Sequence, residues 1–240
     1  MENQTKTIPL QYSNVSYFFV GILICSLVGF HFTYTMKFPD FEGLTYAHHF
    51  HGAMLMSWFF MLIVQPLLIK YKKYKWHKSL GKVSYLLIPL LLFSIFLVTK
   101  VAFYRNITQM PRAVAVGNLS LDLPVILSFG LFYCLAMVYR AKTAYHLRFM
   151  IGTSLLMIGP GIGRAMIIFG GIPFPLAIAY ALYITEIVAA IFLAIDYFKE
   201  NSLQPFAIIL TALIASHLCW NYQMEGWWQA FGEWFIRLCF

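Results

Sequence analysis

Seven histidines are the residues of this sequence best suited to hold a cofactor. His48 and His51 are three positions apart, so on a helix they lie on one face. That spacing can chelate a metal ion, because neutral imidazole is a good ligand for zinc, copper and iron. Two imidazoles can also hold haem iron as its axial ligands. The histidines therefore indicate either a transition-metal site or a haem site.

Three of the histidines are expected at one depth in a membrane. His31, His51 and His217 each lie about five residues from the outer end of an apolar segment, roughly 7 Å along a helix. Asp122 and Arg164 are expected at a similar depth, and a guanidinium can bind a haem propionate through two parallel hydrogen bonds. This layer predicts a b-type haem, or a Cu, Fe or Zn ion, in the outer half of the protein.

The sequence does not decide which histidines of this layer are the ligands. His51 and His217 are the first choice, with His31 or His48 as alternatives, and a bare metal ion would take His48, His51 and His217. Each histidine alone is more typical of an interfacial side chain or a hydrogen-bond partner. Only their shared depth favours a common cofactor site.

Two further histidines suggest a second, inner site. His77 and His146 each end a Lys-x-x-aromatic-His pattern just before an apolar segment. Together they could ligate a second haem near the cytoplasmic face. The competing interpretation is that both belong to loops that contact lipid headgroups.

Three charged residues inside apolar segments are candidates for catalysis, because charges are costly in a bilayer unless they are paired or hydrated. Glu186 could relay a proton, or be neutral and hydrogen-bonded to Tyr180, Tyr183 or Thr185 on its own or a neighbouring helix. Asp122 and Arg164 could act in chemistry or form a structural ion pair.

The elements that position these residues are membrane spans. Apolar residues make up 61% of the 240 residues and charged residues only 11%, against about 25% in soluble domains. This excludes soluble enzymes and disordered proteins, and the net charge of +8 indicates topology rather than nucleic-acid binding. Seven stretches are long enough to span a bilayer: 15–36, 46–69, 79–101, 119–139, 147–169, 173–197 and 203–222.

The fold class predicted is therefore all-α, a polytopic membrane helical bundle that forms one transmembrane domain over residues 1–240. A last segment, 226–238, mixes tryptophan and phenylalanine with charged residues and predicts an amphipathic helix lying in the interface. Gly159-Pro160-Gly161 and Gly163 interrupt the fifth span just before Arg164. Freed carbonyls could line a cavity there, or the glycines could allow close helix packing.

The distribution of cations predicts orientation. Lysines concentrate between the second and third spans, and Arg140, Lys142 and Arg148 lie between the fourth and fifth. By the positive-inside rule these loops are cytoplasmic, which places the N-terminus inside and the C-terminal segment outside.

The four cysteines lack metal-site spacing, although Cys219 and Cys239 could pair at the outer face.

Two stretches resemble a family of bacterial multi-pass membrane proteins of unassigned function. One is His77-Lys78-Ser79-Leu80-Gly81-Lys82, similar to the family's His-Arg-x-x-Gly-Arg; the other is His146-Leu147-Arg148-Phe149-Met150, followed by Arg164. Lys78, Lys82 and Phe149 depart from the family's Arg, Arg and Trp. The resemblance covers spans two to five and implies a bacterial inner-membrane location and a fold. A weaker likeness is to transmembrane b-type cytochromes, in which histidines of separate helices bind haem.

Three functional hypotheses follow. The first is a redox protein that exchanges electrons with a quinone or a periplasmic partner. The second is a non-redox component, such as a transporter or an assembly subunit of a larger membrane complex, whose polar residues form a hydrogen-bonded core. The third is a zinc-dependent intramembrane hydrolase, although the sequence has no HExxH motif.

Overall fold

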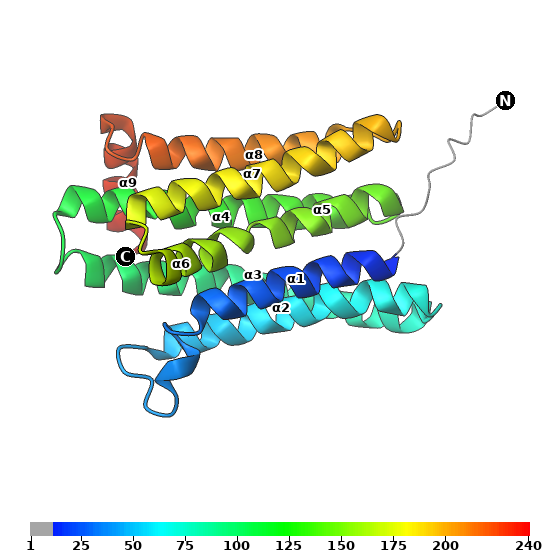
Figure 1. Cartoon of the computed structure of the whole chain (residues 1–240), viewed down its shortest axis with the longest axis horizontal. Coiled ribbons are helices and arrows are strands. Elements are labelled where there is room, and N and C mark those ends of the chain that lie inside the picture. The colour runs from blue at the N-terminus through cyan, green and yellow to red at the C-terminus, as the bar shows by residue number, and fades with distance from the viewer. Residues whose placement is uncertain (1–11) are drawn as a thin grey trace.

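The computed structural model describes residues 12–240, and every regular element in that range is a helix (Figure 1). The elements are α1 (Tyr12–Phe30), η1 (Thr35–Lys37), α2 (Tyr46–Lys70), α3 (Tyr74–Asn106), α4 (Arg112–Val138), α5 (Thr143–Leu155), α6 (Ile158–Gly170), α7 (Phe174–Phe198), α8 (Gln204–Asn221) and α9 (Gly226–Cys239). The predicted all-α fold is confirmed.

Five helical segments are long and apolar enough to cross a membrane. They are Tyr46–Lys70, Tyr74–Asn106, Arg112–Val138, Thr143–Gly170, which joins α5 to α6, and Phe174–Phe198. Helices α8 and α9 together supply enough apolar length for a sixth, but the chain bends by 96° between them, and α1 is a shorter apolar helix. The chain is thus a multi-pass helical membrane protein, whereas the predicted number of seven spans is not confirmed.

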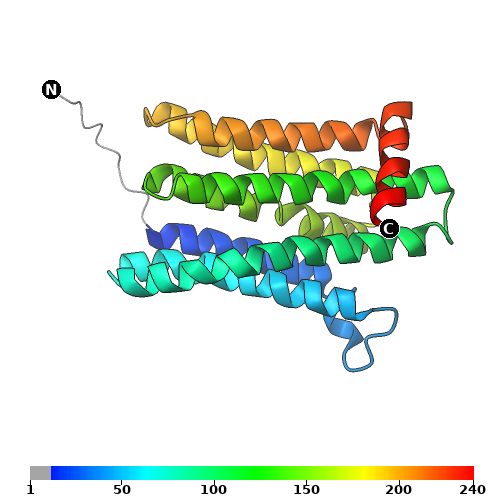
Figure 2. The ribbon, with the colours of Figure 1, turned by 180° about the vertical axis from the view of Figure 1, so that it is seen from behind.

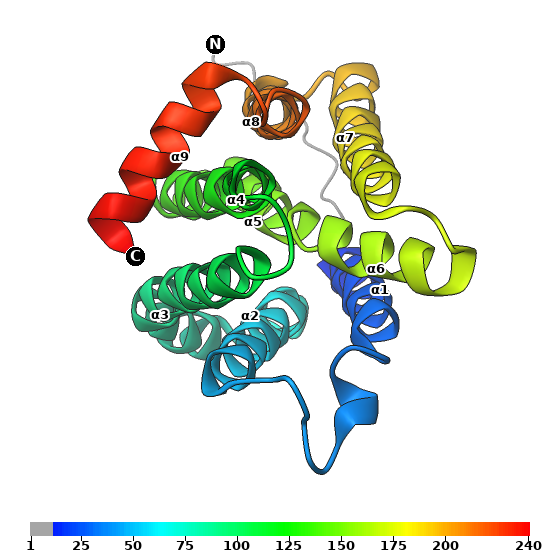
Figure 3. The same ribbon diagram turned by 90° about the vertical axis from the view of Figure 1, so that its left-hand side faces the viewer.

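Helices α1 to α5, α7 and α8 run along the long axis of the molecule, whereas α6 is steeply inclined to it (Figure 3) and α9 lies across one end (Figures 1 and 2). The turns that join α2 to α3, α4 to α5 and α7 to α8 lie together at the opposite end. We call these the α9 end and the lysine-rich end; the latter comprises residues 71–73, 139–142 and 199–203. All the cation-rich turns that the sequence predicts at one membrane face are therefore at one end of the bundle.

Aromatic and aliphatic side chains fill the bundle core. Trp58 of α2 is 1% exposed and packs edge-on against Phe129 of α4, with ring centroids 5.8 Å apart. Phe149 of α5 is fully buried and stacks on Tyr139 at 6.0 Å. Aromatic rings that pack edge-on or stacked in this way stabilise the contacts between the helices that carry them. The core thereby fixes the faces on which α2, α4 and α5 present polar residues.

Helices α1 and α6 cross with their backbones in contact at two glycines. A Cβ atom on Gly29 would overlap the carbonyl of Gly161, and one on Gly161 would lie 2.9 Å from the Cα of Ser26. Ser26 Oγ donates to the carbonyl of Met157 at 3.4 Å, where the chain breaks between α5 and α6. Close packing through small residues therefore explains Gly161 in the fifth predicted span.

The predicted C-terminal amphipathic helix is present as α9, and it docks on α4. Arg112 Nε and Nη2 donate to the two carboxylate oxygens of Glu233 at 2.7 and 2.8 Å. Trp228 is buried, and its Nε1 donates to the carbonyl of Val116 at 3.4 Å. Trp227 and Trp234 are more than half exposed. One side of α9 is thus a protein contact rather than a wholly lipid-facing surface.

The contact between α9 and α4 is expected to weaken in acid. Arg112 lowers the pKa of Glu233 by donating hydrogen bonds to its carboxylate. The stabilisation is therefore present above the ordinary glutamate pKa and is lost as the pH falls through the lowered one. Because the side chains are 55% and 33% exposed, we expect less than about 1 kcal/mol. Tryptophan fluorescence of the detergent-solubilised protein, titrated from neutral to acidic pH, measures the change.

The matched control for this titration is Glu233→Gln, which removes the titrating group and keeps the side-chain size. We expect the acid-dependent fluorescence change to be absent in this variant. An unchanged acid transition in Glu233→Gln would show that a different group controls the position of α9.

Candidate functional site

His51 lies in α2 and is anchored to α3. Its Nδ1 is 3.0 Å from Ser94 Oγ, and the Ser94 hydroxyl donates to the carbonyl of Leu91 at 2.7 Å. Because the serine hydrogen is used in that bond, this network assigns the ring hydrogen of His51 to Nδ1, which donates to Ser94. The Nε2 atom then carries a free lone pair. This is the tautomer that a ligating imidazole needs.

Asp122 lies in α4 and Arg164 in α6. The charge of Arg164 acts on both His51 and Asp122, and the Asp122 carboxyl lies beside the hydroxyl of Thr99. The two charged groups form no direct salt bridge; among residues 12–240, the salt bridges join other partners. Asp122 and Arg164 therefore do not form the structural ion pair that is one interpretation of them.

Arg164 is held by its own helix and by an aromatic ring. Its Nη1 donates to the carbonyl of Pro160 at 3.0 Å, and its guanidinium lies 4.1 Å from the centroid of the Phe30 ring. A guanidinium has five N–H donors, and the bond to Pro160 uses one of them. The side chain is fixed in place and retains donors for an anionic or carbonyl group.

His217 of α8 forms a second group with α7. Its Nδ1 is 2.8 Å from Glu186 Oε1, and the residue is 5% exposed. The Tyr183 ring stands edge-on to the imidazole, with centroids 4.5 Å apart. The Nε2 atom of His217 is buried and has no hydrogen-bond partner. Glu186 thus pairs with a histidine of the neighbouring helix rather than with Tyr180, Tyr183 or Thr185.

The structure does not bring His51 and His217 into one contact group. Viewed from the α9 end, α4 lies between the α2–α3 pair and the α7–α8 pair, and it packs against both α3 and α8 (Figure 3). His51 binds Ser94 on the first side, and His217 binds Glu186 on the second. The shared depth that the sequence indicates is therefore not a shared site.

The alternative ligands His31 and His48 have local structural partners. His31 is exposed in the segment after α1, where its Nδ1 lies 2.9 Å from Thr35 Oγ1. His48 closes a capping box with Thr45 at the start of α2, with its Nδ1 3.0 Å from the Thr45 backbone nitrogen. Within residues 12–240, no three His, Cys, Asp or Glu side chains form a group that could hold a metal ion. His48, His51 and His217 accordingly do not converge.

His77 lies in the first turn of α3 and His146 in the first turn of α5, both at the lysine-rich end. Nδ1 of His146 donates to the carbonyl of Ala136 at 2.8 Å, which leaves its Nε2 lone pair free. Nδ1 of His77 is buried without a partner, and so is Oε1 of Gln65, whose Nε2 donates to the His77 carbonyl at 3.3 Å. The sequence indicates the two histidines but not Gln65, which lies in the middle of an apolar run.

A buried ion pair near the same end has no counterpart among the predicted site residues. Nε and Nη2 of Arg148 in α5 each donate to an oxygen of Asp196 in α7 at 2.6 Å. Both side chains are 5% exposed, and Asn201 donates to the same carboxylate at 3.1 Å. All of these polar groups are paired within the protein. Their arrangement joins α5 to α7.

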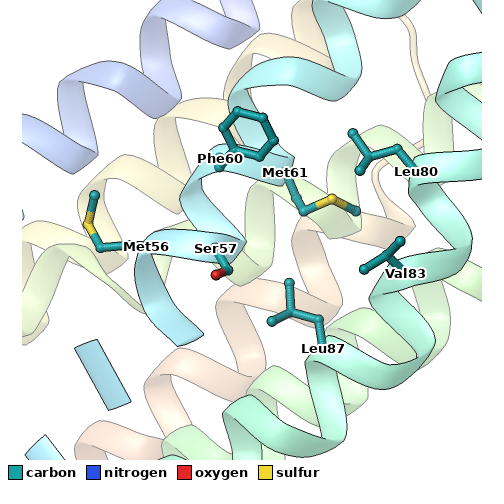
Figure 4. A pocket seen from close by; sticks show the side chains of 7 residues that line it. All are labelled: Met56, Ser57, Phe60, Met61, Leu80, Val83 and Leu87. Carbon is teal, nitrogen blue, oxygen red and sulfur yellow. The ribbon is translucent and has the colours of Figure 1, made fainter. Parts of the chain in front are cut away.

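Two pockets are hollowed into the flanks of the bundle. One, of about 440 Å³, lies between α2 and α3, and Figure 4 shows its lining of Met56, Ser57, Phe60, Met61, Leu80, Val83 and Leu87. The other, of about 510 Å³, lies at the lysine-rich end between α3 and the end of α4. Neither pocket is lined by a histidine. The first is apolar apart from Ser57 and faces the side of the bundle.

The fold and these side chains define a class: a multi-pass helical membrane protein with separate histidine-centred polar groups inside its bundle. Comparisons of the chain with protein-family models, with curated proteins and with solved structures found no match. All four cysteines are free thiols.

Proposed function

We propose that this protein is a redox protein of the bacterial inner membrane that binds haem b, or a Cu or Fe ion, through buried imidazoles. The observation that carries the proposal is the pairing of His217 with Glu186. A carboxylate on Nδ1 fixes the tautomer of an imidazole and increases the basicity of its Nε2, as in most metal-binding histidines. His217 has this arrangement, and its Nε2 is buried and unpartnered.

The unpartnered atom is a reason to expect a ligand. Leaving a buried polar atom unsatisfied costs about 1–3 kcal/mol. A metal centre bound at Nε2 would offset that cost, and Glu186 would stabilise the positive charge that the bond places on the ring. Haem suits an isolated imidazole of this kind, because the macrocycle itself supplies the equatorial nitrogens.

His51 and Arg164 fit a second cofactor position of the same kind. Ser94 orients the His51 ring with its Nε2 free, and Arg164 retains donors that could bind a propionate in a bidentate manner. Since His51 and His217 lie in separate groups, we assign them to separate positions rather than to one iron. When bound, the haem or metal would supply one-electron transfer, with a quinone or a periplasmic protein as the exchange partner.

The orientation that we propose follows the positive-inside rule. The lysine-rich end would face the cytoplasm, and the α9 end, with the C-terminus, would face outside. A periplasmic partner would then approach over α9, whose Trp227 and Trp234 are exposed.

Visible spectra test the proposal directly. The detergent-purified protein is expected to show a Soret band and sharp α-bands after reduction with dithionite, or to contain stoichiometric metal by elemental analysis of the same sample. His217→Ala should lose the signal assigned to its site, because no other imidazole lies in the His217 group. His31→Ala is the matched control, since His31 is exposed and its ring hydrogen-bonds only to Thr35.

A colourless, metal-free and folded wild-type protein would contradict the redox proposal. Loss of the signal in His77→Ala or His146→Ala, with His217→Ala and His51→Ala unchanged, would place the cofactor at the lysine-rich end instead.

A non-redox membrane component is the second candidate, and a specific observation favours it. Several of the polar side chains already have partners in the protein: Arg148 with Asp196, His48 with Thr45, and His49 Nδ1 with Tyr34 Oη at 2.7 Å. Such a core could serve a transporter or an assembly subunit of a larger complex. In that case, the substitutions at His217 and His51 would alter stability without any spectral change.

A further inference from the structure

The pocket at the lysine-rich end has the chemistry of a lipid-headgroup site. It is lined by Tyr85 of α3 and by Met137, Val138, Arg140 and Ala141 at the end of α4, with a volume of about 510 Å³. We propose that it binds the phosphate headgroup of an anionic phospholipid. This site is separate from the histidine groups, and the proposal does not depend on the redox function.

Two hydrogen-bond donors meet at the pocket. Arg140 Nη1 donates to Tyr85 Oη at 3.0 Å, so the tyrosine oxygen is the acceptor and its own hydrogen remains available. That bond also fixes the direction of the guanidinium, whose remaining N–H groups include the pair that can bind a phosphate in a bidentate manner. Arg140 itself is exposed. The pocket can therefore offer charge-assisted bonds from Arg140 and one bond from the Tyr85 hydroxyl.

The other side of the pocket is apolar and open to the lipid side. Val138 is 73% exposed, and Met137 and Ala141 complete the wall beside it. A free phosphate ion would gain nothing from these side chains. A phospholipid would place its headgroup at Arg140 and Tyr85 and its acyl chain along Val138, which matches the polar and apolar halves of the pocket.

The surrounding charge favours an anionic lipid over a zwitterionic one. Lys82 lies one turn before Tyr85 on α3, and Lys142 follows Arg140 by two residues. The C-terminus of α4 favours cations at this position through its partial negative charge, which accounts for the presence of Arg140 but leaves its donors free. Clusters of lysine and arginine next to a span attract anionic leaflets, by about 1 kcal/mol per cation.

The experiment compares retention of phosphatidylglycerol and phosphatidylcholine by the full chain, measured by native mass spectrometry after release from nanodiscs of each lipid. We expect the wild type to retain phosphatidylglycerol selectively. Arg140→Gln should weaken that retention about ten-fold, the effect of losing one charge-assisted contact, and Tyr85→Phe should weaken it less. Lys199→Gln is the matched control: it removes an exposed cation at the same end of the bundle, directly after α7 rather than beside α4.

Equal retention of the two lipids by the wild type would overturn the proposal. So would phosphatidylglycerol retention in Arg140→Gln that equals the wild type, or a loss in Lys199→Gln as large as that in Arg140→Gln. Thermal unfolding of each variant in phosphatidylcholine nanodiscs separates lipid binding from folding, because Arg140→Gln should melt there as the wild type does. Stabilisation by inorganic phosphate equal to that by phosphatidylglycerol would show an anion site and contradict the lipid assignment.

Discussion

Asp196→Asn is expected to destabilise the protein by about 3–5 kcal/mol, the usual cost of leaving one partner of a buried ion pair uncompensated. Arg148 would keep its charge at a position that is 5% exposed, with both of its bonds to the Asp196 carboxylate weakened or lost. Because the pair joins α5 to α7, we expect the loss to be cooperative over the bundle. Thermal unfolding in detergent, followed by circular dichroism, measures the change.

Two comparisons make this result specific to the buried pair. Glu233→Gln removes an equally bidentate ion pair whose side chains are 55% and 33% exposed, so it should cost less than about 1 kcal/mol. The double variant Arg148→Met with Asp196→Leu should recover most of the stability, since replacing both charges by apolar side chains avoids the unpaired charge. If Asp196→Asn unfolds like Glu233→Gln, the Arg148–Asp196 pair does not hold α5 to α7.

The positions of the long helices could be predicted from the sequence, because a bilayer requires an uninterrupted apolar run. The predicted span 46–69 corresponds to α2 (Tyr46–Lys70), and 173–197 corresponds to α7 (Phe174–Phe198). The predicted span 79–101 lies inside a longer helix, α3, which begins at Tyr74 and ends at Asn106. Charged residues flank its apolar run and still adopt helical backbone, so hydropathy marks the span within the helix and not the helix itself.

The partners of the buried polar residues could not be predicted in the same way. Composition places Glu186 and His217 inside spans, but their 2.8 Å contact depends on how α7 and α8 are rotated and shifted against each other. The pairing of Arg148 with Asp196 could not be predicted for the same reason. In the sequence, Arg148 is only one of several cations near a turn. The depth of a residue in the membrane follows from its position along its helix. Which residue it contacts depends on which side of the neighbouring helix faces it. That side is set by the packing of apolar residues around the polar ones.

Gly29→Ala is expected to separate α1 from α6, at a cost of about 3 kcal/mol or more. The new Cβ would overlap the Gly161 carbonyl group, with 2.7 Å to its carbon. Overpacking of side chains costs about 1–3 kcal/mol when rotamers can adjust, but here the obstacle is backbone and no rotamer relieves it. Gly161→Ala should have a similar effect, because its Cβ would lie 2.9 Å from the Cα of Ser26. Thermal unfolding of the purified variants measures both.

Gly21→Ala is the control, because it makes the same chemical change in the same helix where a Cβ meets nothing within 4 Å. Alanine favours the helical backbone over glycine by about 1 kcal/mol in soluble helices, so this variant should unfold no earlier than the wild type. The contrast between the two α1 glycines isolates the crossing point from any general effect on the helix.

Arg164 follows Gly161 by three residues and is bonded to the Pro160 carbonyl. Forcing α6 away from α1 should therefore also move Arg164 from the Phe30 ring and from His51, so that any cofactor signal assigned to His51 should decrease in Gly29→Ala and persist in Gly21→Ala. Equal stability and equal signal in the two variants would show that the α1–α6 crossing does not position this group.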